Sequence, residues 1–385
     1  MIVASTSLVS PDQRPPAPRL DVRALGVQVA ALIAVIGLLA WLTHNAVSNL
    51  AARNIASGFG FLKDSAGFSI SEGIFPYETG DSYLWAFLAG MANTLRVAIP
   101  AVLLASLLGF SAGTAQISRN ALLRTIARTY VDVVRNVPLL VQVLMWYFIV
   151  TESLPAGDSP LVIGGVAFLS KGGLAVAVPE LSLAPALVLV AATIALPALA
   201  WQLTAPQRTA LRFGATLAAL GALAAAWVVA PSGWERPIEG SFGVSGGATL
   251  SPEWLALVSA LTLYAGAYCA EIVRSGILAV QKGQWEAGQA LSFTRPQMLM
   301  HVIMPQSLRI IVPPYTSLIM NTIKNSSLAV AIGYPDIVSV ATTAMNQNGQ
   351  AIECVAVIAA VYLTLNLFTA LMMGLVNARA QLRER

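Results

Sequence analysis

The stretch 285-WEAGQALSFTRPQMLMHVIMPQSLR-309 lies between two long apolar runs and is itself rich in charged, polar and small residues. Its first part, from Gln284 to Leu291, consists mostly of good helix formers and small side chains. Glu286 stands near the beginning, where an acidic residue complements the helix dipole. Ala287 and Leu291 are four residues apart and so share one face. We therefore expect a short helix that begins close to Glu286.

A second short helix is expected directly after the first. Phe293 and Thr294 interrupt the helical pattern, and Pro296 suits a first helical turn because its missing N–H has no partner there. Pro305 is expected to stop this helix. Between the two prolines, apolar residues recur at helical spacing: Met298, Leu299 and Val302. Two short helices that meet at a bend form a protrusion, which can fit a groove of another protein.

The composition of the chain indicates a membrane protein. Of its 385 residues, 57% are hydrophobic and only 10% are charged. Soluble domains are about 25% charged, so this chain lacks the polar residues to cover a globule. A bilayer core about 30 Å thick needs roughly 20 apolar residues per helix. The sequence therefore predicts an all-α integral membrane protein with about eight transmembrane helices, near residues 24–43, 84–115, 137–151, 185–203, 213–230, 254–281, 310–332 and 353–376.

The basic residues predict the orientation, because cytoplasmic loops carry an excess of lysine and arginine. With the N-terminus inside, only four of the 22 basic residues fall on the outer side: Arg53, Lys63, Lys171 and Arg236. Both termini are therefore expected in the cytoplasm, and the basic balance is explained without nucleic acid. The first apolar run is about 20 residues long, against roughly 7–15 for a signal peptide core, so we expect an uncleaved span.

The spans divide the chain into four parts. Residues 1–23 are rich in proline, serine and alanine and are expected to form a disordered cytoplasmic tail. Residues 24–83 hold an additional N-terminal transmembrane helix and a long outer segment. Residues 84–376 form the main transmembrane domain, with an inserted segment at 152–253 that is rich in glycine, proline and serine in its outer parts. Residues 377–385 form a short cytoplasmic tail.

The sequence shows no residue pattern for covalent chemistry. It has no G-x-x-x-x-G-K-[ST] stretch, so nothing in this chain predicts a cradle for ATP phosphates. The histidines, His44 and His301, have no metal-ligand companions nearby. The cysteines, Cys269 and Cys354, fall in apolar runs and are interpreted as small buried side chains. We expect the chain neither to be an enzyme nor to hold a metal or cofactor of its own.

Several polar residues are expected inside the membrane. Lys324 is followed by Asn325 and Ser326, and a lysine at mid-span costs about 2.5–3.5 kcal/mol, so it should face protein or water. These three residues are candidates for lining a path across the membrane, where Lys324 would meet a carboxylate. The alternative is a structural pair, or a bond to carbonyls at the end of the span. Asn93 is a further candidate for the path, and Arg96 beside it is expected to snorkel outward.

The stretch 285–309 resembles the EAA loop of ABC importer permeases, the coupling segment that docks on a cytoplasmic ATPase. The matching residues are Glu286, Ala287, Leu291 and the run Ile303–Met304–Pro305. Two positions depart from the family pattern: Gly288 replaces the usual alanine, and Ser292 replaces the usual glycine. Gly288 should loosen the first helix by up to about 1 kcal/mol relative to alanine. Ser292 can still bond to the local backbone at a bend.

The flanking runs are similar to those of polar amino-acid permeases. The matching blocks are RNVPLLVQVLMWYF (135–148), YCAEIVRSGILAVQKGQWEA (268–287) and IIVPPYTSLIMNTIKNSSLAVAIGYPDIV (310–338). The block SGFGFL (57–62) and the inserted segment 152–253 resemble the general L-amino acid permease subfamily. The resemblance implies a type I ABC importer core of five helices, to which span one and the fourth and fifth spans are additions.

The resemblance also implies partners and a location. Such a permease works with a second homologous permease, an ABC ATPase subunit that binds the ATP, and a periplasmic binding protein, in the inner membrane of a bacterium. Similar systems carry L-amino acids, often glutamate, glutamine, aspartate and asparagine. The alternatives are a secondary transporter driven by an ion gradient and a membrane scaffold without a transport role. A secondary transporter needs no ATPase-docking segment and usually carries carboxylates inside the membrane for ion coupling.

The acidic residues argue against the ion-driven alternative, because nearly all of them fall in loops or at the ends of spans. Glu271 and Arg274 lie near the inner end of the span 254–281 and are spaced i, i+3, so they share one helical face. We interpret them as a local ion pair beside the ATPase contact.

Overall fold

The structure, a computed structural model, describes residues 22–52, 57–180, 233–240 and 243–380, with isolated positions between 188 and 226. The chain divides into two units, Met1–Phe59 and Gly60–Arg385. The first unit contains helix α1 (Val22–Ala52), whose stretch Gly26–Asn45 is long and apolar enough to cross a membrane. The predicted span at 24–43 is therefore a helix. The segment from Gly60 to the start of α2, predicted to be outside, belongs to the second unit.

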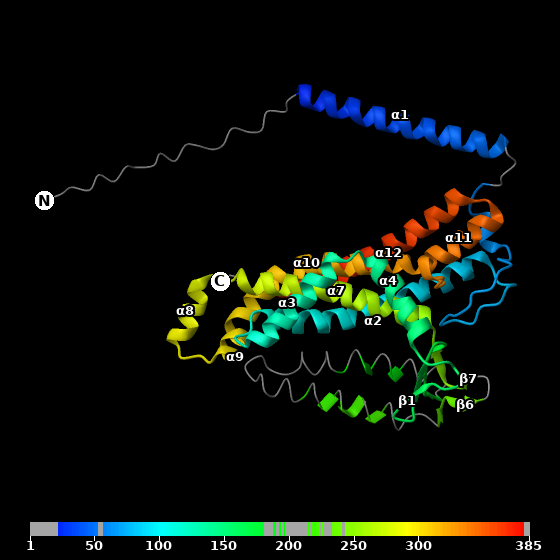
Figure 1. Cartoon of the computed structure of the whole chain (residues 1–385). Helices are drawn as coiled ribbons and strands as arrows, with labels where there is room; N and C mark the ends of the chain where they lie inside the picture. Colours follow the sequence, from blue (N-terminus) through cyan, green and yellow to red (C-terminus); the bar gives the residue numbers. More distant parts are fainter. Residues whose placement is uncertain are drawn as a thin grey trace. The chain divides into compact units, whose positions relative to one another are not determined.

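The second unit is built mainly of helices (Figure 1). The α-helices are α2 (Tyr83–Gln116), α3 (Ala121–Asn136), α4 (Leu139–Phe148), α7 (Pro252–Leu278), α8 (Lys282–Ala290), α9 (Arg295–Met298), α10 (Met304–Asn325), α11 (Ile337–Asn348) and α12 (Ala351–Ala380). Shorter turns are the 3-10 segments η1 (Phe59–Lys63) and η4 (Ser326–Ile332) and the π segments η2 (Ile149–Ser153) and η3 (Leu299–Ile303). The all-α membrane class is thus confirmed.

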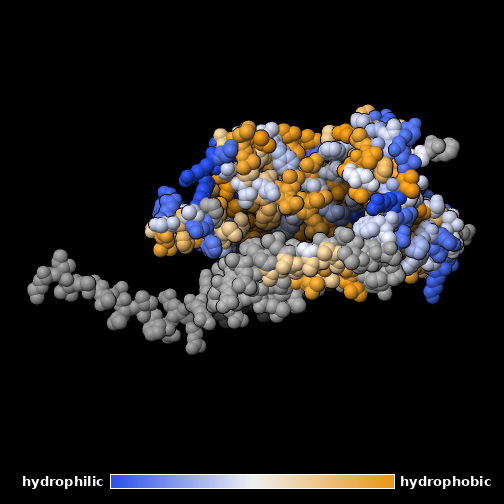
Figure 2. Space-filling view, turned by 90° about the horizontal axis from the view of Figure 1, so that it is seen from below, coloured by the Kyte–Doolittle hydropathy of each residue, from blue (hydrophilic) through white to orange (hydrophobic). Residues whose placement is uncertain are grey.

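The described residues account for six of the predicted spans. Four helices are long and apolar enough to cross a membrane, or up to six if each of two bent helix pairs is one span. The predicted spans at 185–203 and 213–230 lie outside the continuously described residues. Figure 2 shows hydrophobic residues over the middle of the visible face and hydrophilic residues gathered toward its ends. This distribution suits a protein whose middle lies in lipid.

The two bent pairs have local causes in the sequence. Between α3 and α4 the chain turns by 103° at Val137–Pro138, where proline disfavours helical geometry in the preceding residue. Between η4 and α11 it turns by 53° after Gly333, which adopts a left-handed backbone with φ 79°. Helix α3 was not predicted, because its arginines were assigned to a cytoplasmic loop.

A small set of β-strands joins α4 to α7 and was also not predicted. Strands β1 (Leu161–Ile163), β2 (Ala167–Ser170), β3 (Gly173–Val176) and β8 (Ala248–Leu250) form an antiparallel sheet in that order. Strand β4 (Val178–Pro179) pairs with β5 (Trp234–Glu235), and β6 (Ile238–Gly240) pairs with β7 (Gly243–Ser245). The register of β3 and β8 sets Leu174 opposite Leu250. Strands of two to four residues are too short to show an alternating pattern in sequence.

Close packing of α2 against α7 forms the centre of the second unit. Gly109 and Gly113, one turn apart on α2, face Cys269 and Val273 on α7. A Cβ atom at Gly109 would lie 2.3 Å from the Cβ of Cys269 and 2.9 Å from the carbonyl oxygen of Gly266. Glycine is therefore required for the two backbones to approach this closely, as small residues allow between membrane helices.

Two further helices pack on this pair. The Tyr130 hydroxyl of α3 donates a hydrogen bond of 2.7 Å to the backbone oxygen of Leu263 in α7. Val131 of α3 is buried together with Ala112 of α2 and Ala270 of α7. Helix α10 approaches α7 at Gly276, where a Cβ would lie 2.4 Å from Cγ1 of Ile311. The four helices α2, α3, α7 and α10 thus form one bundle, with α8 and α9 at one end and the strands toward the other (Figure 1).

Gly109→Ala should destabilise the chain by about 1–3 kcal/mol, because the added methyl group overpacks the contact between α2 and α7. The matched control is Gly374→Ala in α12, where a Cβ meets nothing within 4 Å. Thermal unfolding of the purified protein in detergent should show a lower Tm for Gly109→Ala and an unchanged or slightly higher Tm for the control. Equal Tm values would mean that α2 and α7 tolerate separation.

Candidate functional site

The segment Lys282–Pro305, which we call the coupling loop, contains the two short helices predicted from the sequence. Helix α8 begins at Lys282, not beside Glu286, so no acidic residue lies in its first turn. The expectation that Glu286 complements the helix dipole is therefore wrong. Its carboxylate instead lies 3.4 Å from the ammonium of Lys282 one turn earlier, in an exposed pair. Exposed pairs of this kind contribute about 0.3–0.5 kcal/mol.

Helix α8 ends in a Schellman motif with serine at the left-handed position. The Phe293 N–H donates to the Gly288 oxygen at 3.1 Å, and the Ser292 N–H donates to the Gln289 oxygen at 2.9 Å. Ser292 has φ 56° and is the only non-glycine residue with positive φ among the described residues. The family's usual glycine fits this backbone without strain, whereas serine is strained by about 1–2 kcal/mol.

Gly288 allows the two helices of the coupling loop to pack closely. It is buried, and a Cβ there would lie 3.2 Å from Cε of Met298 in α9. Met298 itself is only 3% exposed. The second helix is fixed at its start by Gln297, whose side-chain oxygen accepts from the backbone N–H of Thr294 at 2.9 Å. The departure from alanine at Gly288 thus creates space for the Met298 side chain.

Pro305 does not stop the second helix. The chain stays helical from Arg295 to Asn325, passing from α9 through the π segment η3 into α10, and Pro305 lies in the first turn of α10. A π turn shifts the hydrogen-bond register from i, i+4 to i, i+5. Pro305 follows this shift directly and has no backbone N–H, so it leaves no unpaired donor where the register changes. The coupling loop is therefore mechanically continuous with a transmembrane helix.

One face of the coupling loop is apolar and exposed. Ala287 and Leu291 share a face of α8, and Leu291 is 69% exposed. Phe293 at the bend and Met300 in η3 are also exposed. Exposed apolar side chains on a polar loop are typical of an interaction surface.

The coupling loop is held to the ends of two transmembrane helices. The Arg295 guanidinium of α9 donates to the backbone oxygen of Ile117, directly after α2, at 2.9 Å. Near the end of α7, Arg274 donates to the Glu271 carboxylate at 3.0 Å, so the predicted ion pair is confirmed. The coupling loop is thus bonded to the end of α2 and continues directly into α10.

The predicted path residues near Lys324 lie in different surroundings. Lys324 is in the last turn of α10, because the α-helix begins at Met304 and gives way to the 3-10 segment η4 at Ser326. Because η4 continues the helical stretch to Ile332, Lys324 lies within the stretch Leu299–Ile332, as the predicted span implies. Its side chain is exposed and makes no ion pair with the described residues. Asn325 is half-buried, and Ser326 is buried, where its hydroxyl donates to the Ile323 oxygen at 2.6 Å.

Lys324 continues a line of exposed polar side chains along α10. Ser317 and Asn321 are also exposed, and their spacing of three to four residues sets all three on one helical face. A polar face on a membrane helix is costly against lipid. It therefore requires water or another protein in front of it.

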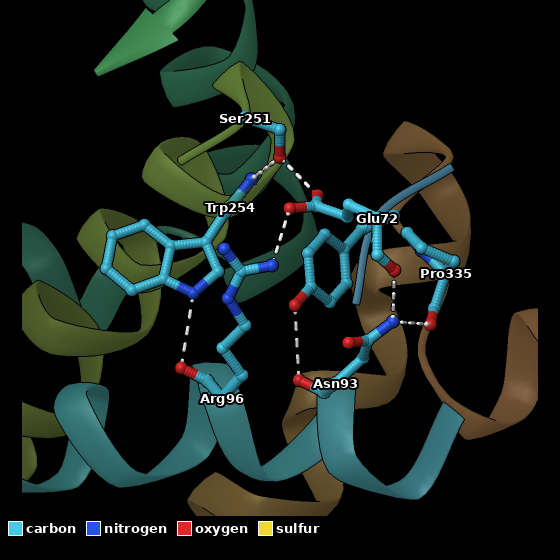
Figure 3. A network of polar contacts seen from close by, with 7 residues as sticks. Glu72, Asn93, Arg96, Ser251, Trp254 and Pro335 are labelled. Atoms are coloured by element: carbon cyan, nitrogen blue, oxygen red, sulfur yellow. Dashed lines mark hydrogen bonds and ion pairs between the residues drawn. The ribbon is translucent and has the colours of Figure 1, made fainter. Parts of the chain in front are cut away.

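Asn93 and Arg96 belong to a buried polar network at the other end of the bundle (Figure 3). Asn93 is fully buried, and its amide donates to the backbone oxygens of Glu72 at 2.8 Å and Pro335 at 3.0 Å. The Arg96 guanidinium reaches the segment before α2, where it forms an ion pair of 2.9 Å with the Glu72 carboxylate. Within the described residues, no hydrogen bond or ion pair joins Asn93 to Lys324.

Glu72 links the outer segment before α2 to the start of α7. Its carboxylate also accepts from the hydroxyl of Ser251, the N-cap residue of α7. Burial raises the pKa of Glu72 above its ordinary value, while Ser251 and Arg96 oppose this change by stabilising the carboxylate. This network fastens the segment 64–82, and Asn93 is one of its structural members.

Sequence reasoning missed a second polar surface, on α3 and α7. Asp132 and Arg135 of α3 are exposed although α3 packs along α7. The Arg135 guanidinium lies over the Tyr268 ring, 5.0 Å from its centroid, and the Tyr264 hydroxyl lies 3.3 Å from that of Tyr268. Recurrence of charged residues at i, i+4 and i+7, beginning with Arg128, is the signal that would have identified α3 as an amphipathic helix.

Comparison with known proteins identifies the family of the chain. The family model described as "Binding-protein-dependent transport system inner membrane component" matches residues 105–382. A putative amino-acid ABC transporter permease protein of Escherichia coli, YhdX, is 42% identical, over 94% of this chain and 95% of its own length.

Two further relatives cover 94% of this chain. The general L-amino acid transport system permease protein AapQ of Rhizobium johnstonii is 37% identical and is covered over 93% of its length. The glutamate/glutamine/aspartate/asparagine transport system permease protein BztB of Rhodobacter capsulatus is 32% identical and is covered over 95% of its length.

Ser292→Gly should stabilise the coupling loop by about 0.5–1 kcal/mol, because relief of the left-handed strain exceeds the extra backbone entropy of glycine. The matched control is Ala290→Gly, two residues earlier in helical geometry, which should destabilise by a similar amount. Amide hydrogen exchange of residues 286–293 should slow about twofold to fivefold in Ser292→Gly and accelerate in the control. Faster exchange in Ser292→Gly would contradict the strained-cap interpretation.

Proposed function

Because the chain belongs to the family of binding-protein-dependent transport system inner membrane components, we propose that it is a permease subunit of an ATP-driven ABC importer for L-amino acids. The family and the resemblance to general L-amino acid permeases are those predicted from the sequence. No comparison supports the alternative of an ion-driven secondary transporter.

The observation that carries this proposal is the exposed apolar face of the coupling loop. Ala287 and Leu291 present a small and a large apolar side chain on one face of α8. A small residue beside a protruding leucine suits docking into a groove of another protein. In this proposal the coupling loop docks into a groove of an ABC ATPase subunit. That subunit binds the ATP. The permease itself uses no cofactor and catalyses no covalent step.

The remaining parts of the proposal follow from the family. The partners are a second homologous permease and a periplasmic amino-acid-binding protein, and the location is the bacterial inner membrane with both termini in the cytoplasm. The permease domain at 84–376 contains the inserted segment 152–253 and is preceded by the tail 1–23 and the additional N-terminal helix and segment 24–83, and followed by the tail 377–385. The names of the relatives favour polar and acidic amino acids, including glutamate, glutamine, aspartate and asparagine.

We further propose that the translocation path runs along the exposed polar face of α10. Ser317, Asn321 and Lys324 form this face, and Asn325 lies beside its end. Lys324 would attract the carboxylate of an amino acid at the outer part of the path. Ser326 and Asn93 are buried, and in this proposal they position the neighbouring backbone without contacting the substrate. Lys324 in the last turn also complements the helix dipole, so a purely structural role is the alternative to test.

Ala287→Trp should reduce amino-acid uptake by the complete transporter at least about tenfold, because the larger ring would hold the docking surfaces apart. ATP hydrolysis should no longer respond to the binding protein, while the abundance of the permease in the membrane stays near normal. Gln281→Trp, with the same bulk at the exposed residue directly before the coupling loop, is the matched control.

Proteoliposomes that contain this chain alone separate the two functions. An ion gradient and labelled glutamate should give no saturable uptake without the ATPase. Saturable uptake that is indifferent to Ala287→Trp would contradict the ABC proposal and favour a secondary transporter.

Lys324→Met should lower uptake about tenfold to a hundredfold while insertion and assembly persist, because a charge-assisted bond to a substrate carboxylate contributes about 1.5–3 kcal/mol. Lys63→Met removes an exposed cation from the outer segment and should leave uptake unchanged. The measurement is the initial rate of labelled glutamate uptake against concentration. Unchanged kinetics in Lys324→Met would favour the purely structural role.

A further inference from the structure

A basic cavity lies where the coupling loop meets the ends of α2, α3 and α7. Its volume is about 480 Å³. Its lining includes Gln116 at the end of α2 and four arginines: Arg124, Arg128, Arg274 and Arg295. No acidic side chain contributes to the lining. Arg124, Arg128 and Arg295 form no ion pair with the described residues, so their converging positive charges favour a bound anion.

The arginines retain hydrogen-bond donors for such an anion. Arg274 is neutralised by Glu271 on its own helix. Arg124 and Arg295 each donate a hydrogen bond of 2.9 Å to a backbone oxygen, of Ser118 and Ile117 respectively, which leaves most of their five N–H groups available. Arg128 makes no ion pair with any described residue, including Asp132 one turn further along α3.

Gln116 provides an independent indication of a ligand. Its side chain is 3% exposed, and its Nε2 donor has no hydrogen-bond partner. A buried donor without an acceptor costs about 1–3 kcal/mol, so such groups are normally satisfied. Since Gln116 lines the same cavity as the arginines, an anion held there would supply the missing acceptor. Phosphate suits this set of donors because its several oxygens accept from forked guanidinium groups.

The shape of the surroundings favours a phospholipid over a free phosphate. A neighbouring groove of about 590 Å³ shares Ile117, Ser118 and Arg295 with the basic cavity and is lined further on by Leu123 and Leu299. On α3, Leu122 and Ile126 are exposed, 70% and 59%. A basic cavity beside a groove of mixed polar and apolar lining, next to the exposed apolar side chains of α3, matches the charged headgroup and apolar chains of a phospholipid.

From this geometry we propose that the cavity at Gln116, Arg124 and Arg128 binds the phosphate headgroup of an anionic phospholipid, whose acyl chains lie along Leu123 and the exposed side of α3. Because Arg295 belongs to the coupling loop, a lipid bound here would fasten that loop to α2 and α3. This inference does not depend on the identity of the transported substrate or on Lys324.

Native mass spectrometry of the purified full-length chain tests the proposal. The chain is incubated with phosphatidylglycerol and phosphatidylcholine of identical acyl chains. Phosphatidylglycerol should be retained at least fivefold more strongly. Arg128→Gln should raise its dissociation constant about fivefold, the effect of removing one arginine–phosphate contact. Arg236→Gln, which removes one exposed arginine outside the cavity, should leave retention unchanged.

A second variant and a competitor make the outcome decisive. Gln116→Glu keeps the size of the side chain but replaces the donor with an anion, so it should also weaken phosphatidylglycerol retention at least fivefold in protein that elutes as wild type on gel filtration. Inorganic phosphate at millimolar concentration should not displace the lipid. Equal retention of the two lipids, displacement by inorganic phosphate, or full retention in both cavity variants would overturn the proposal.

Discussion

The contact on which the rest of this structure depends is the close approach of α2 and α7 at Gly109 and Gly113. Between membrane helices there is little hydrophobic driving force, since lipid tails are as apolar as leucine, so helix association relies on close packing and hydrogen bonds. With the two backbones in contact, Val131 of α3 is buried beside both helices, and the Tyr130 hydroxyl reaches a carbonyl of α7. The glycines of α2 therefore determine where α3, and with it the basic cavity, can lie.

The sequence predicts the parts of the fold that depend on hydropathy alone. The long apolar runs at 84–115, 254–281 and 353–376 correspond to α2, α7 and α12 within a few residues. The prediction from hydropathy fails for a helix that carries several charged residues. Helix α3 carries arginines that loop statistics assign to the cytoplasm, yet these residues cover one face of a helix that packs on α7. The strands are missed because they are only two to four residues long, and because β3 also pairs with β8, more than 70 residues further along the chain.

The candidate site shows the same division between local and distant information. The two helices of the coupling loop, the bend at Ser292 and the Glu271–Arg274 pair are local in sequence, and the sequence predicts them. The start of α8 at Lys282 and the continuation of helix through Pro305 are not predicted, because a π turn leaves no mark in composition. Asn93 was predicted to line the path because the sequence does not reveal its partners. Its partners, Glu72 and Pro335, are distant along the chain, so its polarity looks functional until they are seen.

The two ends of the bundle are built on different physical principles, and this difference is suited to a transport cycle. At the end opposite the coupling loop, Glu72, Arg96 and Ser251 join three segments through half-buried, charge-assisted bonds. At the coupling-loop end, single bonds such as that from Arg295 to Ile117 hold the loop beside the basic cavity, and the cap at Ser292 is strained. Since the helix from Arg295 to Asn325 is continuous, a displacement of this weaker end is transmitted along α10 to the polar face that ends at Lys324. The stronger end supplies the fixed reference against which α10 can move.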